Sequence, residues 1–127
     1  MKAPPAGPTP VVAGTFPLLF VTQVPVSGDF TAITATFGNH HSSMQQAPRG
    51  GDLWIRYPDG IRKNLTQTAG FGMEGMQLAQ AIAVRDPSVH WDGQKALFSM
   101  VIGAPTQQFH VQDFFWQLYE ITGFGKN

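Results

Sequence analysis

Glycine and proline interrupt this chain so often that long helices are not expected. The sequence holds 14 Gly and 10 Pro among 127 residues. Glycine disfavours a helix interior, and proline removes a backbone donor and fixes φ. The segments between these breaks are rich in Val, Ile, Leu and aromatic side chains, which suit a pleated sheet. The spacing therefore predicts an all-β fold built from short strands and tight turns.

The first half of the chain predicts two strands separated by a long loop. Residues 17–26 are apolar and β-rich, and a polar stretch follows over residues 27–51. In residues 53–56, Leu and Ile alternate with Trp and Arg, which is the period of two that is typical of a strand.

Two turn signals predict hairpins. The first is Pro-Asp-Gly, with Asp59 and Gly60, after which residues 61–66 are expected to return as a short polar outer strand. The second is Asp92-Gly93, a pair that favours a tight hairpin because Gly tolerates a positive φ.

The second half predicts three more strands. Pro87 is expected to begin the first of them, which ends at Trp91, because proline cannot donate to a sheet ladder. Residues 94–102 are then expected to return as an apolar strand. Residues 116–121 alternate again. Between the two halves, residues 67–85 read as a connector with room for a short helix.

The two halves echo each other. The segment LLFVT aligns with ALFSM, so that Leu19 corresponds to Leu97. The segment DLWI aligns with QLYE, so that Leu53 corresponds to Leu118. Each copy reads as an apolar strand, a loop of variable length, an alternating strand and a Gly turn. Repeats of strands joined by tight turns indicate a β-propeller or a related array.

The stretch DPSVHWDGQKALFS followed by WQLYEITG resembles the repeat of TolB-type, WD40-like β-propellers, and GGDLWIRYPDGIRKNLT resembles the third and fourth strands of such a blade. More narrowly, these segments are similar to the middle, propeller domain of the hydrazine synthase alpha subunit family. The resemblance implies blades of antiparallel strands. Because a propeller needs at least about four blades, it also implies an incomplete fragment of a larger propeller.

The resemblance divides the chain into four parts. Residues 1–15 are a Pro-rich tether, and residues 16–66 are strands of one blade with a long inserted loop. Residues 67–85 are the inter-blade connector, and residues 86–127 are the next blade, incomplete at its C-terminus. The layers between blades are expected to be filled by apolar side chains from both copies: Leu19, Phe20, Leu53, Ile55, Val89, Leu97, Phe98, Leu118 and Tyr119. The expected partners are the remaining blades or another protein.

Composition excludes several classes of function. Eight basic and eight acidic residues give a formal net charge of zero, so the chain lacks the basic surface that nucleic acid requires. The sequence has no Cys and therefore no Cys-ligated metal or thiol nucleophile. No apolar run is long enough to span a membrane, and no signal peptide is recognisable. The family resemblance alone points to the periplasm or to secretion.

Histidine and aspartate supply the few candidate site residues. His40 and His41, in the long first loop, are weak candidates for metal or haem ligation; a solvated polar loop is the simpler interpretation. On the expected innermost strand, Asp86 and His90 are candidates to face a central channel, as a ligand contact or a proton-transfer pair. A hydrogen bond from His90 to a neighbouring blade is the alternative.

These observations favour a non-catalytic propeller segment that acts as an interaction or ligand-binding scaffold, with no catalytic residue and no cofactor of its own. The alternative is part of a multidomain periplasmic oxidoreductase whose haem or metal is held elsewhere in the full-length protein. A weaker third option is a propeller that guards access to a hydrolase domain. Pro87, Trp91, Asp92, Gly93, Asp59 and Gly60 are interpreted as structural turn residues.

Overall fold

The computed structural model describes residues 14–23, 49–72, 81–104 and 114–127. Six strands and one short helix lie in these ranges. They are β1 (Leu18–Val21), β2 (Leu53–Arg56), β3 (Arg62–Asn64), α2 (Leu65–Thr68), β4 (Ile82–Val89), β5 (Ala96–Ile102) and β6 (Gln117–Ile121).

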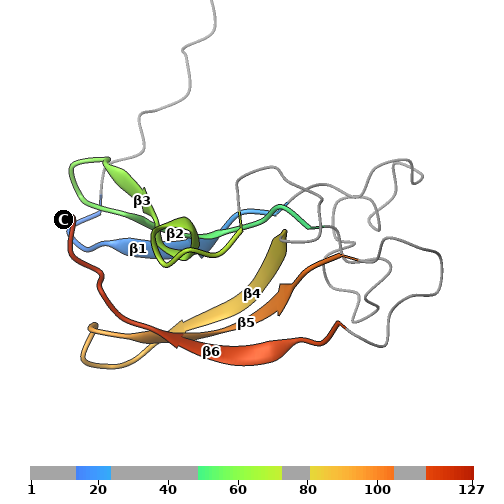
Figure 1. Ribbon diagram of the computed structural model, residues 1–127. Coiled ribbons are helices and arrows are strands. Elements are labelled where there is room, and N and C mark those ends of the chain that lie inside the picture. Colours follow the sequence, from blue (N-terminus) through green and yellow to red (C-terminus); the bar gives the residue numbers. More distant parts are fainter. Residues whose placement is uncertain (1–13, 24–48, 73–80, 105–113) are drawn as a thin grey trace, which may run out of the picture.

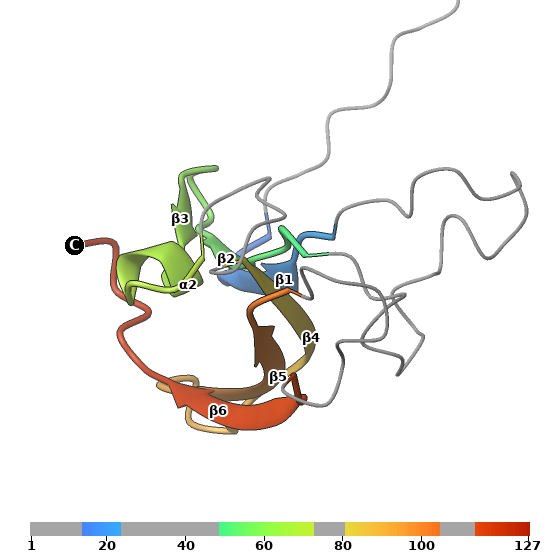
Figure 2. The same ribbon diagram turned by 45° about the vertical axis from the view of Figure 1, so that its right-hand side comes forward.

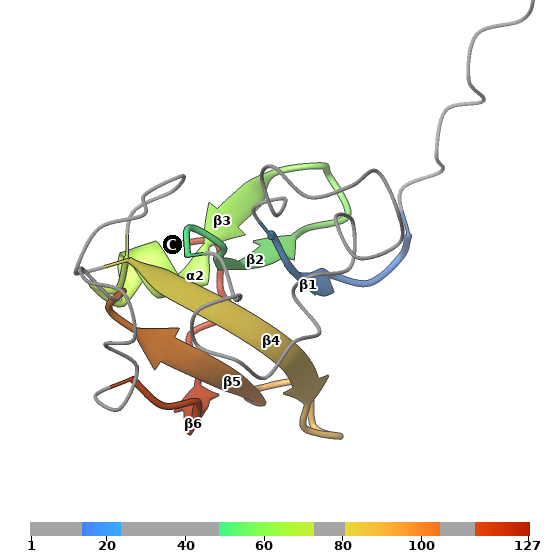
Figure 3. The same ribbon diagram turned by 90° about the vertical axis from the view of Figure 1, so that its right-hand side faces the viewer.

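The strands form two antiparallel sheets in chain order. Sheet A has the order β1-β2-β3 and sheet B the order β4-β5-β6. Figure 1 shows the two sheets as separate layers, one above the other, and Figure 3 shows β4 passing close to β1. The prediction of an all-β fold is confirmed at this level, since strand is the main regular structure of the described residues and the one helix has only four residues.

The β2–β3 hairpin turns at the predicted Pro-Asp-Gly signal. The Gly60 N–H donates to the Tyr57 carbonyl at 2.9 Å, and the Tyr57 N–H donates to the Ile61 carbonyl at 2.8 Å. Gly60 has φ +87°, which an L side chain would adopt only with strain. The Asp59 carboxylate accepts the Ile61 N–H at 3.1 Å. A type I turn followed by a left-handed Gly is a common three-residue hairpin loop.

The β4–β5 hairpin is wider than the predicted Asp-Gly turn. The His90 N–H donates to the Lys95 carbonyl, and the Gly93 N–H donates to the His90 carbonyl, both at 2.8 Å. Trp91 and Asp92 are therefore the central turn residues, and Gly93 follows them with φ +71°. Gly93 takes the positive φ, as predicted, but it ends the turn rather than sharing its centre with Asp92.

Strand β4 begins earlier than expected and contains Pro87 in its interior. It starts at Ile82, inside the segment expected to be a connector. The pairing with β5 shifts between Arg85 and Ser88, and Asp86 adopts φ +51° in this bulge. The missing N–H of Pro87 is tolerated because β4 is an edge strand and the bulge removes Pro87 from the ladder.

A short helix follows β3 where only the end of a strand was expected. The Asn64 side-chain oxygen accepts the Gln67 N–H at 2.9 Å, and Asn64 is the N-cap of α2. The Thr68 hydroxyl donates to the Asn64 carbonyl at 2.6 Å. Asparagine at this position satisfies a backbone donor that a helix start leaves free. The helix predicted within the connector, over residues 73–82, lies outside the described residues except at its end, where Ile82 begins β4 instead.

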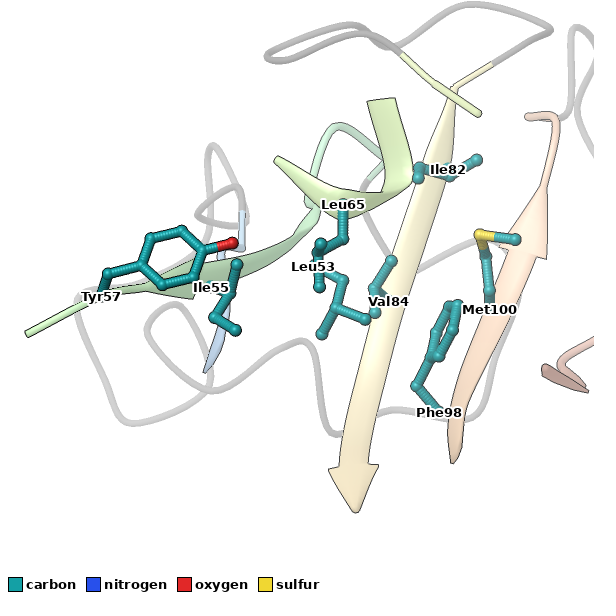
Figure 4. Close-up of a cluster of buried hydrophobic side chains, with 8 residues drawn as sticks. All are labelled: Leu53, Ile55, Tyr57, Leu65, Ile82, Val84, Phe98 and Met100. Atoms are coloured by element: carbon teal, nitrogen blue, oxygen red, sulfur yellow. The ribbon is translucent and has the colours of Figure 1, made fainter. Parts of the chain in front are cut away.

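The core lies between the two sheets. Leu53 and Ile55 from β2 pack with Val84, Phe98 and other side chains of sheet B, as Figure 4 shows. The buried cluster contains Leu53, Ile55, Tyr57, Leu65, Ile82, Val84, Phe98 and Met100. Burying an apolar side chain of this size contributes roughly 1.5–3 kcal/mol. This layer of apolar contacts is the core that the two sheets share.

The two sheets repeat one pairing scheme. Val21 pairs with Leu53 in sheet A, and Ser99 pairs with Leu118 in sheet B. The predicted matches of Leu53 with Leu118 and of Leu19 with Leu97 are confirmed by register, and residues related in this way are called equivalent below. The other equivalent pairs are Leu18–Arg56 with Ala96–Ile121, Leu19–Ile55 with Leu97–Glu120, and Phe20–Trp54 with Phe98–Tyr119.

Opposite faces of this repeated unit meet in the core. Leu53 and Ile55 face inward from sheet A, whereas their equivalents Leu118 and Glu120 lie on the exposed face of sheet B. The inner face of sheet B uses the alternate positions, namely Ala96, Phe98, Met100, Tyr119 and Ile121. Because side chains alternate along a strand, the sheets are stacked in the same sense, like successive units of a repeat.

After β6 the chain crosses back to sheet A. The Tyr57 hydroxyl donates to the Phe124 carbonyl at 2.7 Å. The Lys63 ammonium donates to the carbonyls of Gly123 and Gly125, at 3.3 and 2.8 Å, and to that of Asn127. Figure 2 shows this segment running from β6 toward α2 and β3. Residues 122–127, called the C-terminal clamp below, therefore link the two sheets.

Candidate interaction surfaces

The outer face of sheet B exposes apolar side chains. This face contains Leu97, Ser99, Leu118 and Glu120, which pair across β5 and β6. Leu118 is 69% exposed and Leu97 is 43% exposed. Both were expected to fill a layer between blades, and within the described residues this layer is absent on their side. An exposed apolar row on a sheet is typical of a surface that contacts another protein.

The β4–β5 hairpin extends this surface. Trp91 at its tip is 90% exposed, and its ring lies 5.0 Å from that of His90 between centroids. Beside it is a hollow of about 490 Å³. The hollow is lined by Ser88, Val89, His90, Trp91, Lys95, Ala96, Leu97 and Glu120. An indole beside an apolar floor is well suited to contact a partner, because Trp supplies a large area with few rotatable bonds.

Charged groups lie at the rim of this hollow. Lys95 Nζ lies 3.0 Å from Glu120 Oε2, and His90 Nδ1 lies 2.9 Å from Asp92 Oδ1. The Gln94 N–H, followed by the His90 side chain, lowers the pKa of Asp92 below its usual value. Asp92 is therefore ionised at neutral pH. His90 Nδ1 also accepts the Asp92 N–H at 3.4 Å.

The two residues expected to face a channel are not brought into contact. The His90 side chain contacts Asp92. Asp86 is exposed in the β4 bulge with φ +51°. The structure shows no direct contact for the predicted Asp86–His90 pair, because the His90 side chain pairs with Asp92 of its own hairpin. A hydrogen bond from His90 to a neighbouring blade stays a prediction. Asp86 lies within β4, an edge strand of sheet B, and His90 directly follows the end of that strand at Val89.

The outer face of sheet A is different in character. Phe20 and Trp54 pair across β1 and β2 and are half-buried, and Leu18 beside them is 55% exposed. Arg56 and Arg62 pair across β2 and β3 at one end of this face. A hollow of about 500 Å³ is lined by Phe20, Thr22, Trp54, Gly60 and Arg62. The face thus combines aromatic rings with two guanidinium groups.

A buried polar network, not recognised in the sequence, fixes the start of β2. The Thr66 hydroxyl donates to Asp52 Oδ1 at 2.7 Å and accepts the Leu53 N–H at 3.2 Å. Thr22 Oγ1 accepts the Asp52 N–H at 3.0 Å. Asp52 and Thr66 are 0% and 1% exposed. Buried polar groups of this kind need partners, so the network is a structural tie between β1, β2 and α2.

Two arginines, Arg49 and Arg85, are associated with sheet B. Arg49 is 2% exposed, and its Nε donates to the Gly103 carbonyl at 2.6 Å. Burial, and then the nearby Arg85 charge, lower the pKa of Arg49 below its usual value. Burial also lowers the pKa of Arg85, whose guanidinium lies 4.3 Å from the centroid of the Trp116 ring. Such stacking stabilises a partly desolvated cation.

The metal candidates His40 and His41 lie outside the described residues. Within the described ranges, no group of three or more His, Cys, Asp or Glu side chains could hold a metal ion. Among the same residues, no helix is long and apolar enough to cross a membrane. No protein-family model, no curated protein and no solved structure matches this chain.

Proposed function

We propose that this chain is a non-catalytic scaffold of the β-propeller type, in which sheets A and B are two successive blades that present sheet faces to a partner. The same-sense stacking of two sheets with one pairing scheme supports this proposal, because propeller blades pack face to back around a ring. So does the resemblance to TolB-type repeats and to the middle domain of the hydrazine synthase alpha subunit family.

One observation carries the proposal. Leu53 is fully buried by sheet B, whereas its equivalent Leu118 is 69% exposed. The same contrast separates the partly buried Leu19 from the exposed Leu97. The sequence thus keeps core-type residues at positions that have no cover among the described residues. The outer face of sheet B therefore has the same kind of apolar side chains at the same strand positions as the core, and such a face can bind another sheet or protein.

The expected partner is a further β-sheet layer, supplied by additional blades or by another protein. A flat face of Leu side chains at strand spacing favours a sheet, whose own alternating side chains interdigitate with it. The resemblance to TolB-type repeats supports a location in the periplasm or outside the cell. Catalysis plays no part in the proposed role, which depends on shape and apolar contact.

Site-specific photocrosslinking tests this function in cells that make the protein. A benzoylphenylalanine at position 118 is expected to give one discrete adduct, and a second substitution, Leu97→Asp, is expected to abolish it. The control places the same photoreactive residue at position 61. Ile61 is 56% exposed and lies next to the β2–β3 turn, away from the outer face of sheet B. Equal labelling from both positions, or none from position 118, would contradict the proposed surface.

A further inference from the structure

The two outer faces of this molecule are equivalent to the two halves of its own core. The core is formed where the Leu53 side of sheet A meets the Phe98 side of sheet B. The outer face of sheet B is equivalent to the inner face of sheet A, because Leu97 and Leu118 are equivalent to Leu19 and Leu53. One half of an interface that the chain already makes is therefore displayed on its surface.

The other half is displayed on the opposite side. Phe20 and Trp54, on the outer face of sheet A, are equivalent to Phe98 and Tyr119, on the inner face of sheet B. Phe98 and Tyr119 stack with ring centroids 5.9 Å apart and face the core. The outer face of sheet A therefore presents an aromatic pair at the positions that sheet B uses to receive the Leu53 side of sheet A.

The two outer faces carry charged residues of opposite sign, although Glu120 on sheet B is already paired with Lys95 at 3.0 Å. Glu120 on sheet B is equivalent to Ile55, and Arg56 on sheet A is equivalent to Ile121. Ile55 and Ile121 both belong to the core cluster, on facing sheets. If the outer faces meet as the inner faces do, a carboxylate comes near a guanidinium, and Arg62 adds a second positive charge beside it. Among the described residues, neither arginine belongs to a salt bridge.

We propose that a second copy of this chain packs the outer face of its sheet A on the outer face of sheet B, repeating the intramolecular stacking between molecules. The inference rests on the proposed scaffold function and names the partner of that surface. The contact is heterologous, since different faces of the two copies meet, and a heterologous contact extends into a ring or an open array. A ring of about four to eight blades corresponds to roughly two to four copies.

Two variants, each blocking one face, test this association. Leu118→Arg blocks the outer face of sheet B and Leu18→Arg blocks that of sheet A. Both side chains are largely exposed, at 69% and 55%, so the fold is expected to survive. Gln67→Arg is the matched control, because Gln67 is exposed on α2, away from both outer faces. Circular dichroism checks that all three variants keep the wild-type fold.

Sedimentation velocity of the purified 127-residue chain provides the measurement. We expect the wild type and Gln67→Arg to associate, and each face variant alone to be monomeric, with a dissociation constant raised at least about tenfold. An equimolar mixture of the two face variants is expected to form heterodimers and nothing larger, because each retains the face that the other lacks.

Three outcomes would overturn the inference. They are a monomeric wild type, a face variant that still dimerises alone, and a mixture of face variants that remains monomeric. Dimerisation of one variant alone would indicate an isologous contact, in which a face meets its own copy. A monomeric wild type combined with a discrete photocrosslink from position 118 to another protein would remove self-association and leave the scaffold function standing. Loss of both signals would remove both proposals.

Discussion

Sheets A and B use the same pairing scheme and differ in what covers them. In sheet A the Leu53 side is buried by sheet B, polar groups are tied into a network, and the C-terminal clamp holds the hairpin. In sheet B the equivalent side exposes Leu118, and its hairpin ends in an exposed Trp91. Burial of a sheet face in this chain therefore depends on whether another sheet packs against that face, rather than on the sequence of its strands.

The largest expected effect comes from the equivalent pair of leucines. Leu53→Ala removes a fully buried side chain, and we expect the free energy of unfolding to fall by about 2–5 kcal/mol. Leu118→Ala is expected to change it by no more than about 0.5 kcal/mol, since Leu118 is an exposed residue. Urea unfolding, at concentrations where the chain is monomeric, measures both. Similar losses for the two variants would contradict the described difference in burial.

The buried network gives the next effect. Thr66→Val removes the hydroxyl that donates to Asp52 and accepts the Leu53 N–H, and this is expected to cost about 1–3 kcal/mol of unfolding free energy. The position equivalent to Asp52 in sheet B is Gln117, which is exposed. Gln117→Ala should therefore be nearly neutral by the same measurement. A neutral Thr66→Val would show that the network does not stabilise sheet A.

Two tyrosines test the C-terminal clamp. Tyr57→Phe removes the hydroxyl that donates to the Phe124 carbonyl, with an expected loss of about 0.5–1.5 kcal/mol. Tyr119→Phe is the matched control, because the Tyr119 hydroxyl contacts only the exposed side chain of Gln117 in the described residues. Thermal unfolding should therefore separate the two variants. If Tyr119→Phe proves the more costly, the clamp contributes less than the geometry indicates.

The smallest effect concerns the two hairpin aspartates. The Lys126 side chain, and then the Ile61 N–H, lower the pKa of Asp59 below its ordinary value of 3.8. Because the folded pKa is depressed, this stabilisation is present above pH 3.8 and is lost as the pH falls through the lower, folded value. Lys126→Ala is expected to return the Asp59 pKa toward 3.8.

Asp92 provides the comparison in sheet B. The first cause of its lowered pKa is the Gln94 backbone N–H, with the His90 side chain second. His90→Ala is therefore expected to raise the Asp92 pKa less than Lys126→Ala raises that of Asp59. Carboxyl carbon chemical shifts followed by NMR against pH measure both values. If His90→Ala raises the Asp92 pKa more than Lys126→Ala raises the Asp59 pKa, the order of causes given for the two aspartates is wrong.

Much of the strand arrangement could be predicted from local signals. The alternation in residues 53–56 and the Pro-Asp-Gly turn predicted β2 and the β2–β3 hairpin, and the echo of Leu53 in Leu118 predicted equivalent positions in β2 and β6. Each of these signals acts over a few residues or repeats along the chain. They determine which strands pair, and the observed sheets follow them. Whether the sheets are blades of a larger propeller stays a prediction.

Features that depend on distant residues could not be predicted in the same way. Proline chemistry alone predicts that Pro87 starts a strand. Its observed position inside β4 requires a bulge, and that bulge depends on the pairing of β4 with β5. Asp52 and Thr66 are 14 residues apart, and nothing local indicates that they share a buried hydrogen bond. The exposure of Leu118 could not be predicted either. Its sequence context matches that of the buried Leu53, and its exposure depends on the absence of a covering sheet among the described residues.

The C-terminal clamp also has a consequence for the order in which the chain folds. Lys63 and the carbonyl of Gly125 are 62 residues apart in sequence, so this contact forms only after β4, β5 and β6 have been made. During synthesis, the β2–β3 hairpin leaves the ribosome without its clamp and with the Leu53 side uncovered. Because non-local contacts slow folding, sheet A is expected to mature late, even though it is translated first.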